Sequence, residues 1–115
     1  MAYDEALAAR FRDALAGMAG VTEKRMMGGV CFLLDGNMIG GADRTKAGDG
    51  RFMFRVGKNN EDAALAMPGA QQMEQGGRRM SGFFFVPEDQ CSEPVLKDWL
   101  SLALSFVTSL PPKKK

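Results

Sequence analysis

A glycine-rich stretch, RMMGGVCFLLDGNMIGG at residues 25–41, constrains the fold more than any other part of the chain. Its apolar run ends at Asp35-Gly36-Asn37, a strong turn signal because glycine and asparagine tolerate positive φ. We expect one long strand over Glu23–Leu34, a tight turn, and a returning strand over Met38–Ala42. The stretch therefore predicts a β-hairpin.

The alternative is a glycine-rich loop that binds phosphate. Such a loop needs consecutive backbone N–H groups at the start of a helix, but Gly28-Gly29 precedes a strand-like apolar run. The sequence also lacks G-x-G-x-x-G and the lysine followed by Ser or Thr of a P-loop. Glycines inside a strand indicate a bulge or a close approach. We expect a large side chain, Trp99 or Phe106, over the thin patch at Gly40-Gly41.

Periodicity and turn signals predict the remaining elements. Apolar residues at helical spacing indicate a first helix over 4–16, with Leu7, Phe11, Ala14, Leu15 and Met18 on its buried face. Residues 51–56 alternate, so Phe52, Phe54 and Val56 are expected on one face of a strand and Arg51, Met53 and Arg55 on the other. We expect a loop over 43–50, a short helix over 61–67, strands over 70–74 and 79–86, and a last helix capped by Ser92 with an apolar stripe reaching Leu110.

These elements predict an α+β fold in the order α-β-β-β-α-β-β-α. The short connections favour a two-layer α/β sandwich with a mainly antiparallel, five-stranded sheet and helices on one face. A chain of 115 residues suits one domain, which we place at residues 1–110. Residues 111–115 carry three lysines after two prolines and are expected to form a basic, disordered tail.

The composition argues against an enzyme. Histidine is absent, so the commonest general base and metal ligand is missing, and the carboxylates are scattered over helix starts. We expect no catalytic residues, no cofactor and no metal. Cys31 and Cys91 lack the spacing of a disulfide framework or a metal site and are interpreted as reduced thiols. With no apolar leader and no membrane-length apolar run, we expect a cytoplasmic protein that does not bind membranes.

The nine methionines allow three interpretations. Thioethers can bind soft metals such as Cu(I), they can form an adaptable surface for a partner, or they can fill gaps in the core. The sequence alone leaves the partner surface and the core open, and the lack of histidine and clustered cysteine disfavours a metal.

A candidate interaction surface consists of arginines. Arg25, Arg55, Arg78 and Arg79 could form a basic rim together with Lys24, Arg51 and Lys58. Nucleic-acid binding would also need exposed aromatic side chains, but Phe52, Phe54 and Phe83–Phe85 are expected to be buried. The net charge of +1 supplies no strong attraction for a polyanion.

Four landmarks together resemble the N-terminal domain of the TfoX/Sxy family. They are MAYDEALAARFRDAL, VTEKRMMGGVCFLLDGNMIGG (the K-x-M-F-G-G…G-x-M hairpin, with Met27 in place of Phe), FMFRVG, and GGRRMSGFFFV (the G-R-x-M-x-G-[WF] strand). The closing WLSLALSFVTSLPPKKK is similar to the ending of single-domain members, and the loop at 41–48 is longer than the family pattern.

The resemblance implies a secretion-chaperone-like two-layer fold and kinship with regulators of natural competence, which act alongside a transcription factor. Longer members carry a second, helical domain, whereas the resemblance here covers the N-terminal domain. We therefore expect a non-enzymatic regulatory or protein-interaction domain, with a homodimer as one form of partner. The alternatives are a nucleic-acid-associated transcriptional regulator and a small-molecule binder with a cavity at the glycine-thinned hairpin.

Overall fold

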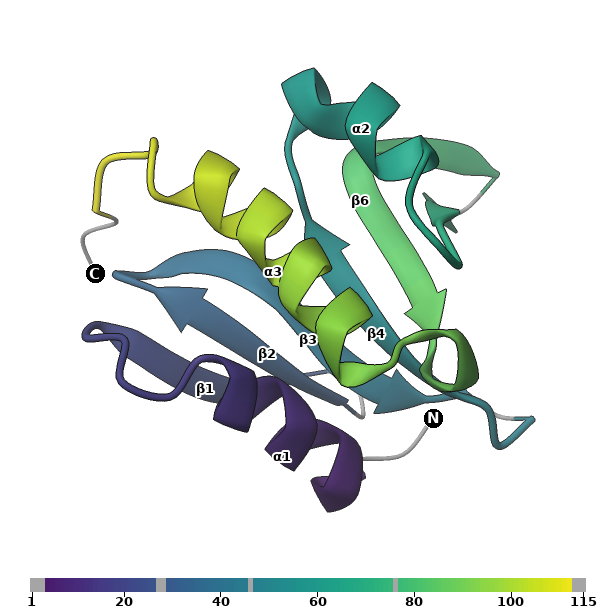
Figure 1. The fold of residues 1–115 in the computed structure, drawn as a ribbon, viewed down its shortest axis with the longest axis horizontal. Helices are drawn as coiled ribbons and strands as arrows, with labels where there is room; N and C mark the ends of the chain where they lie inside the picture. Colours follow the sequence, from purple (N-terminus) through teal and green to yellow (C-terminus); the bar gives the residue numbers. More distant parts are fainter. Residues whose placement is uncertain (1–3, 27–28, 46, 76, 113–115) are drawn as a thin grey trace.

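The fold is a six-stranded sheet with three helices, seen in a computed structural model that describes residues 4–26, 29–45, 47–75 and 77–112 (Figure 1). The elements follow the chain in this order: α1 (Glu5–Ala14), β1 (Val21–Met26), β2 (Gly29–Leu34), β3 (Asn37–Arg44), β4 (Gly50–Arg55), the 3₁₀ turn η1 (Lys58–Asn60), α2 (Glu61–Leu65), β5 (Gln71–Gln75), β6 (Arg78–Pro87), the 3₁₀ turn η2 (Glu88–Gln90) and α3 (Glu93–Val107).

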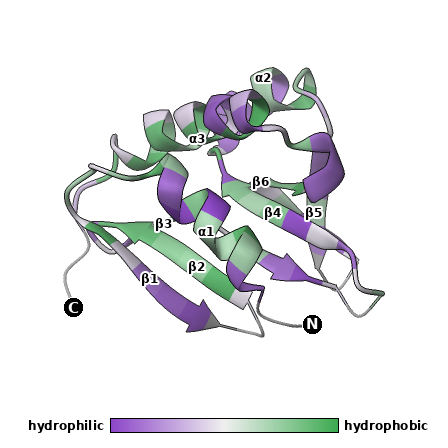
Figure 2. Ribbon diagram, turned by 60° about the horizontal axis from the view of Figure 1, so that its bottom comes forward, coloured by the Kyte–Doolittle hydropathy of each residue, from purple (hydrophilic) through white to green (hydrophobic). Residues whose placement is uncertain are grey.

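The sheet has the strand order β1-β2-β3-β4-β6-β5, and every neighbouring pair is antiparallel. The helices lie together on one side of it (Figure 2). The expected α+β class, antiparallel sheet and one-sided helix layer are therefore confirmed. No helix in the described residues has the length and apolar character needed to cross a membrane.

The prediction of five strands was wrong, because the expected long strand over Glu23–Leu34 is two strands. β1 and β2 pair antiparallel with Met26 opposite Gly29, which leaves a two-residue connection, the shortest common hairpin length. Met27 and Gly28 themselves lie outside the described residues. Residues 26–34 contain no charged residue, so the sequence pattern gives no sign that the chain reverses direction within this stretch.

The core lies between the sheet and the helices and is built on stacked aromatic rings. Phe11 of α1 stacks on Phe32 of β2 with ring centroids 4.5 Å apart, and Trp99 of α3 stacks on Phe54 of β4 at 5.2 Å. The buried and half-buried residues of β4 alternate as expected. Met18 was wrongly assigned to the buried face of the first helix, because α1 ends at Ala14 and the Met18 side chain is 38% exposed.

Gly40 confirms the prediction that glycine in the hairpin allows a neighbouring strand to approach closely. A Cβ on Gly40 would lie 2.0 Å from the carbonyl oxygen of Met53 on β4, so only glycine fits. The β2–β3 register shifts beside it, between Phe32 and Leu33, as a bulge requires. The side chain over Gly40 is Phe11 rather than Trp99 or Phe106, because α1 crosses this part of the sheet; Phe106 packs against Gly57 instead.

The remaining boundaries differ from expectation at element ends. β3 and β4 extend into the expected loop over 43–50, because Asp43 and Arg44 pair with Arg51 and Gly50. α3 begins after Ser92, as expected, but the Ser92 side chain makes no capping hydrogen bond, and the helix ends at Val107, before Leu110. Residues 113–115 of the expected tail lie outside the described residues.

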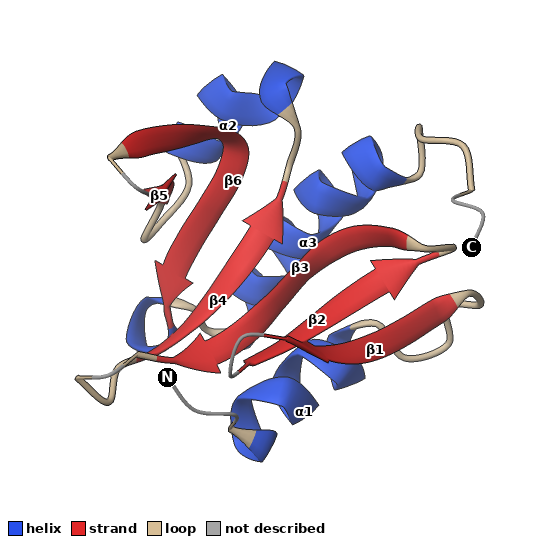
Figure 3. Ribbon diagram, turned by 180° about the vertical axis from the view of Figure 1, so that it is seen from behind, coloured by secondary structure: helices blue, strands red, loops and turns tan. Residues whose placement is uncertain are grey.

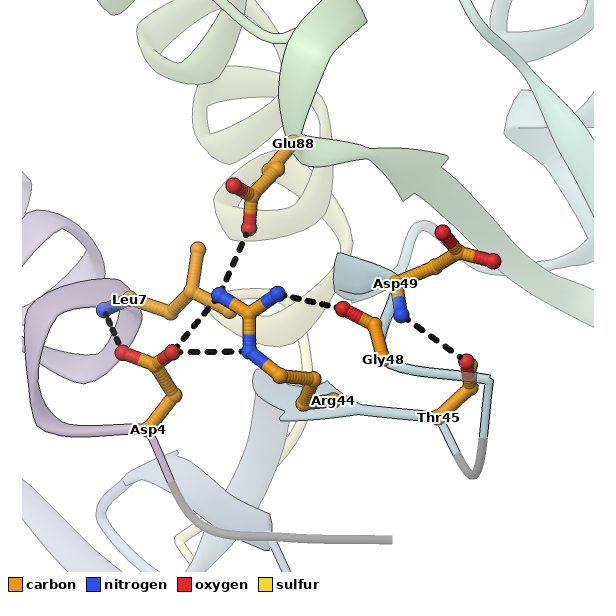
Figure 4. Close-up of polar contacts among 7 residues, drawn as sticks. All are labelled: Asp4, Leu7, Arg44, Thr45, Gly48, Asp49 and Glu88. Carbon is orange, nitrogen blue, oxygen red and sulfur yellow. Dashed lines mark hydrogen bonds and ion pairs between the residues drawn. The ribbon is translucent and has the colours of Figure 1, made fainter.

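A polar cluster around Arg44 joins the helix layer to the end of the sheet (Figure 4). The Arg44 guanidinium donates to Asp4 at 2.6 and 2.9 Å and to Glu88 at 3.2 Å. Asp4 also caps α1 by accepting from the backbone N–H of Leu7 at 3.1 Å. One arginine thus ties the start of α1, the end of β3 and the turn before α3.

Candidate functional site: a methionine-lined hollow on the open face

One face of the sheet carries no helix in the described part of the chain, and we call it the open face. Figure 3 looks onto it, with β2, β3 and β4 in front of α1 and α3. In β4 and β6 its residues are the half-buried ones that alternate with the buried core positions. Any contact through this face depends on what its side chains offer.

A single row of residues crosses the centre of the open face. Cys31 of β2 is paired with Gly41 of β3, Gly41 with Met53 of β4, and Met53 with Phe85 of β6. The two smallest members, Cys31 and Gly41, are neighbours. A Cβ on Gly41 would lie 2.3 Å from the carbonyl oxygen of Val30, so the β2–β3 backbone requires glycine there. At these two positions β2 and β3 therefore carry no large side chain on this face.

A hollow with a volume of about 410 Å³ lies over Cys31 and Gly41. Four methionines, two phenylalanines and one cysteine line it: Met38, Met53, Met73, Met80, Phe83, Phe85 and Cys31. Thioethers also bind soft metals, but a metal site closes its ligands tightly around one ion, whereas this space is as large as a small-molecule pocket. The arrangement suits an apolar guest or an apolar partner surface.

One wall of the hollow depends on a bend in β6. Gln72 pairs with Phe84, whereas Glu74 pairs with Arg79, so two steps along β5 match five along β6. Gly82, inside this irregularity, has φ of +81°, which L side chains rarely adopt. Its N–H donates to the carboxylate of Glu61 on α2 at 2.6 Å, and its carbonyl oxygen accepts from the N–H of Val56 at 2.8 Å. The bend is thus held by contacts on both sides.

The rim of the hollow contains an ion pair in which the charges of Arg51 and Asp43 cancel. Arg51 donates to the carboxylate of Asp43 at 2.8 and 3.2 Å, through two nitrogens. The Arg51 guanidinium carbon also lies 3.8 Å from the centroid of the Phe85 ring, a cation–π distance. The pair therefore fixes one aromatic wall and presents little net charge to the hollow.

Comparison of the sequence with models of known protein families places the chain in one of them. The model of the TfoX N-terminal domain matches residues 13–107, which is most of the chain. The chain belongs to the TfoX N-terminal domain family. No curated protein and no solved structure matched it.

The TfoX-like motif at residues 77–83 contributes directly to the hollow. Its methionine, Met80, and its last residue, Phe83, line the cavity, and its second glycine, Gly82, forms the bend. A Cβ on Gly82 would lie within 2.9–3.1 Å of the backbone at Gly57 and Lys58. In this TfoX domain the motif therefore helps to form the hollow on the open face.

The two thiols of the TfoX domain are poor nucleophiles. Burial raises the pKa of Cys91 to about 11, and burial together with the nearby Asp43 carboxylate raises the pKa of Cys31 above its usual value. Near neutral pH both are therefore uncharged thiols. Both are free, and Cys31 lies in the floor of the hollow.

Of the four arginines expected to form an interaction surface, Arg25 lies apart from Arg78 and Arg79. Arg25 is on the edge strand β1, which β2, β3 and β4 separate from Arg78 and Arg79 on β6. At one strand spacing per step this is about 19 Å across the sheet. Arg55 lies 5.2 Å from the Phe106 ring centroid, and Arg79 lies 3.7 Å from the Glu61 carboxylate.

The sequence did not predict that two half-buried phenylalanines belong to the site. All three residues Phe83–Phe85 were expected to be buried, but only Phe84 is; Phe83 and Phe85 are half-buried on the open face. The alternation of β6 was the available signal, because consecutive strand residues face opposite sides. The same rule correctly places Met53 on the other face of the sheet from Phe52 and Phe54.

Proposed function

We propose that this TfoX domain is a non-enzymatic regulatory domain that works by binding a protein partner on its open face. The observation that carries the proposal is the methionine-lined hollow. A contiguous apolar surface with a polar rim is characteristic of interaction sites. Methionine side chains are flexible and polarisable, so they adapt to a partner's shape.

Family membership supports the regulatory part of the proposal. The TfoX N-terminal domain is the domain of competence regulators, and the chain matches it over residues 13–107. We therefore assign it a role in transcription regulation exercised through another protein. Two free, buried cysteines suit the reducing conditions of the cytoplasm, where we place this role.

The chemistry of the described residues supports binding rather than catalysis. The sequence has no histidine, and burial raises the pKa of both thiols, which disfavours the reactive thiolate. The carboxylates of Asp4, Asp43 and Glu61 accept hydrogen bonds that hold the fold together. Among the described residues, no group of three His, Cys, Asp or Glu is arranged to hold a metal.

The test is quantitative partner capture from the native cell by tagged variants. The double variant Met53→Gln/Met80→Gln places amides on the open face, and Met18→Gln makes the same change at an exposed site off it. We expect a partner retained equally by wild type and Met18→Gln but reduced at least about tenfold by the double variant, because an unsatisfied buried amide is costly. Equal capture by all three would reject the open face as the contact surface.

Self-association is the simplest form of this partnership and has its own measurement. Light scattering coupled to gel filtration reports the mass of wild type and of the double variant. A dimer that dissociates in the double variant but persists in Met18→Gln identifies the partner as a second copy. A monomer at all concentrations assigns the surface to another protein.

A further inference from the structure

We propose that the hollow on the open face is a site for one small, uncharged, mainly apolar molecule, and that this molecule competes with the protein partner. Only the competition rests on the proposed function; the site itself stands on the geometry of the isolated domain.

The size of the hollow fits a small molecule. Its volume of about 410 Å³ falls within the range of roughly 300–1,000 Å³ that is typical of ligand pockets. Its lining is dominated by thioether and aromatic side chains, which offer a guest dispersion contacts and few hydrogen bonds. A polar metabolite would lose more in hydration than these groups return.

The floor of the hollow is set by backbone rather than by movable side chains. Gly41 cannot carry a side chain, because its Cβ would lie 2.3 Å from the carbonyl oxygen of Val30. Its neighbour across the pair, Cys31, has a small side chain. The space above them therefore exists without any guest, so binding requires little reorganisation.

The wall is held by the helix layer on the other side of the sheet. The Glu61 carboxylate accepts from the N–H of Gly82 at 2.6 Å and fixes the bend that separates Met80 from the rest of β6. Met80 and Met73 both line the hollow beyond this bend. The site thus has a rigid floor and anchored wall, with flexible methionine tips that adapt to the guest.

The charges of the rim favour an uncharged guest. Arg51 donates to Asp43 at 2.8 and 3.2 Å and lies over the Phe85 ring. Its positive charge is therefore already partnered and is not available to an anionic ligand. The other charged lining residue, Glu74, is exposed at the edge, where water screens its charge. An anionic guest would lose hydration without gaining a counter-charge, and a cation beside Glu74 would gain only a weak, water-screened attraction.

A pair of fluorescent probes tests the class of guest. N-phenylnaphthylamine is uncharged and apolar, and anilinonaphthalene sulfonate has the same ring skeleton with one negative charge. We expect saturable binding of one N-phenylnaphthylamine per chain, at least about tenfold tighter than the sulfonate, because a buried charge without a partner is costly. Absence of saturable binding by wild type, or equal affinity for both probes, overturns the proposal.

Three variants locate the site. Met53→Gln adds an amide to the lining and should weaken binding of N-phenylnaphthylamine about tenfold, whereas Met18→Gln should leave the affinity unchanged. Cys31→Leu fills the hollow with apolar volume and should also weaken binding, which keeps the test decisive if the glutamine variant misfolds by circular dichroism. Weakening by Met18→Gln as large as by Met53→Gln overturns the assignment.

The competition has a separate readout. Addition of N-phenylnaphthylamine to the partner capture should reduce the captured partner in proportion to occupancy of the hollow. Probe binding on the isolated domain without any effect on capture retains the site and rejects the competition. Capture that depends on the open face, with no probe binding, rejects the site and retains the proposed function.

Discussion

Glu61 accepts a hydrogen bond from the backbone N–H of Gly82 at 2.6 Å, and this contact links α2 to the bend of β6. Removal of the carboxylate leaves the N–H of a buried glycine without its charged acceptor. We expect Glu61→Ala to lower the free energy of unfolding by about 1–3 kcal/mol, and Glu61→Gln to lower it less, because the amide keeps an acceptor oxygen. Urea denaturation measures both.

The matched control for Glu61 is its neighbour Asp62, which also lies in the first turn of α2 but is exposed. Asp62→Ala removes the same favourable interaction with the helix dipole without touching Gly82. If Asp62→Ala and Glu61→Ala cost the same, the bend of β6 does not depend on the carboxylate.

A second prediction concerns Gly40, whose Cβ would lie 2.0 Å from the carbonyl oxygen of Met53. We expect Gly40→Ala to cost about 3 kcal/mol or more, since backbone on two strands would have to separate. Gly48→Ala is the control, because its surroundings are open and only its φ of +92° is strained, at about 1 kcal/mol. Thermal unfolding of both variants compares them; a smaller loss at Gly40 would contradict the close approach.

A third prediction follows from Asp4, whose pKa the hydrogen bonds from Arg44 and from the N–H of Leu7 hold below its usual value. Because the folded pKa is the lower one, the unfolded chain takes up the proton first as pH falls. The Asp4 contribution to stability is therefore complete above the unfolded pKa, near 3.8, and is lost as pH falls through the folded pKa.

Asp4→Asn should flatten the acid limb of a plot of unfolding free energy against pH. Asp13→Asn, on the exposed side of the same helix region, removes a charge without removing the contact to Arg44 and serves as the control. An acid limb that is unchanged in Asp4→Asn would show that the contact of Asp4 with Arg44 contributes nothing to the pH dependence.

The thiols give a fourth prediction, about access to the hollow. Cys31 lies in its floor and is 9% exposed, whereas Cys91 is 1% exposed and burial raises its pKa to about 11. We expect iodoacetamide to modify Cys31 before Cys91 in the native protein, as measured by mass spectrometry of peptides. Saturating N-phenylnaphthylamine should slow modification of Cys31 several-fold, following the fraction of hollow left empty, and leave Cys91 unchanged. Faster reaction at Cys91 would mean that the hollow does not admit small molecules.

Local patterns in the sequence predicted local structure well. The alternation of residues 51–56 placed Phe52 and Phe54 in the core and Met53 on the opposite face, as found. The turn at Asp35-Gly36 separates β2 from β3, as its residue types require. Each of these results depends on neighbours in the chain, whose periodicity the sequence displays.

Features that depend on distant residues were not visible in the same way. The pair Gly28-Gly29 is compatible with either a bulge or a reversal, and only the pairing of β1 with β2 decides between them. Gly82 stands directly before the apolar run 83–86, and its bend depends on Glu61, 21 residues away. The hollow exists because β6 is inserted between β4 and β5, which brings Met53 beside Phe85.

The most direct test of the open face uses the methionine methyl groups as reporters in NMR spectra of selectively ¹³C-labelled protein. On titration with N-phenylnaphthylamine, we expect shifts at Met38, Met53, Met73 and Met80, which line the hollow. Met18, which is exposed elsewhere, and Met67, which packs against the core, should not move. Shifts at Met18 or Met67 without shifts at the four lining methionines would contradict the assignment of the open face as the binding surface.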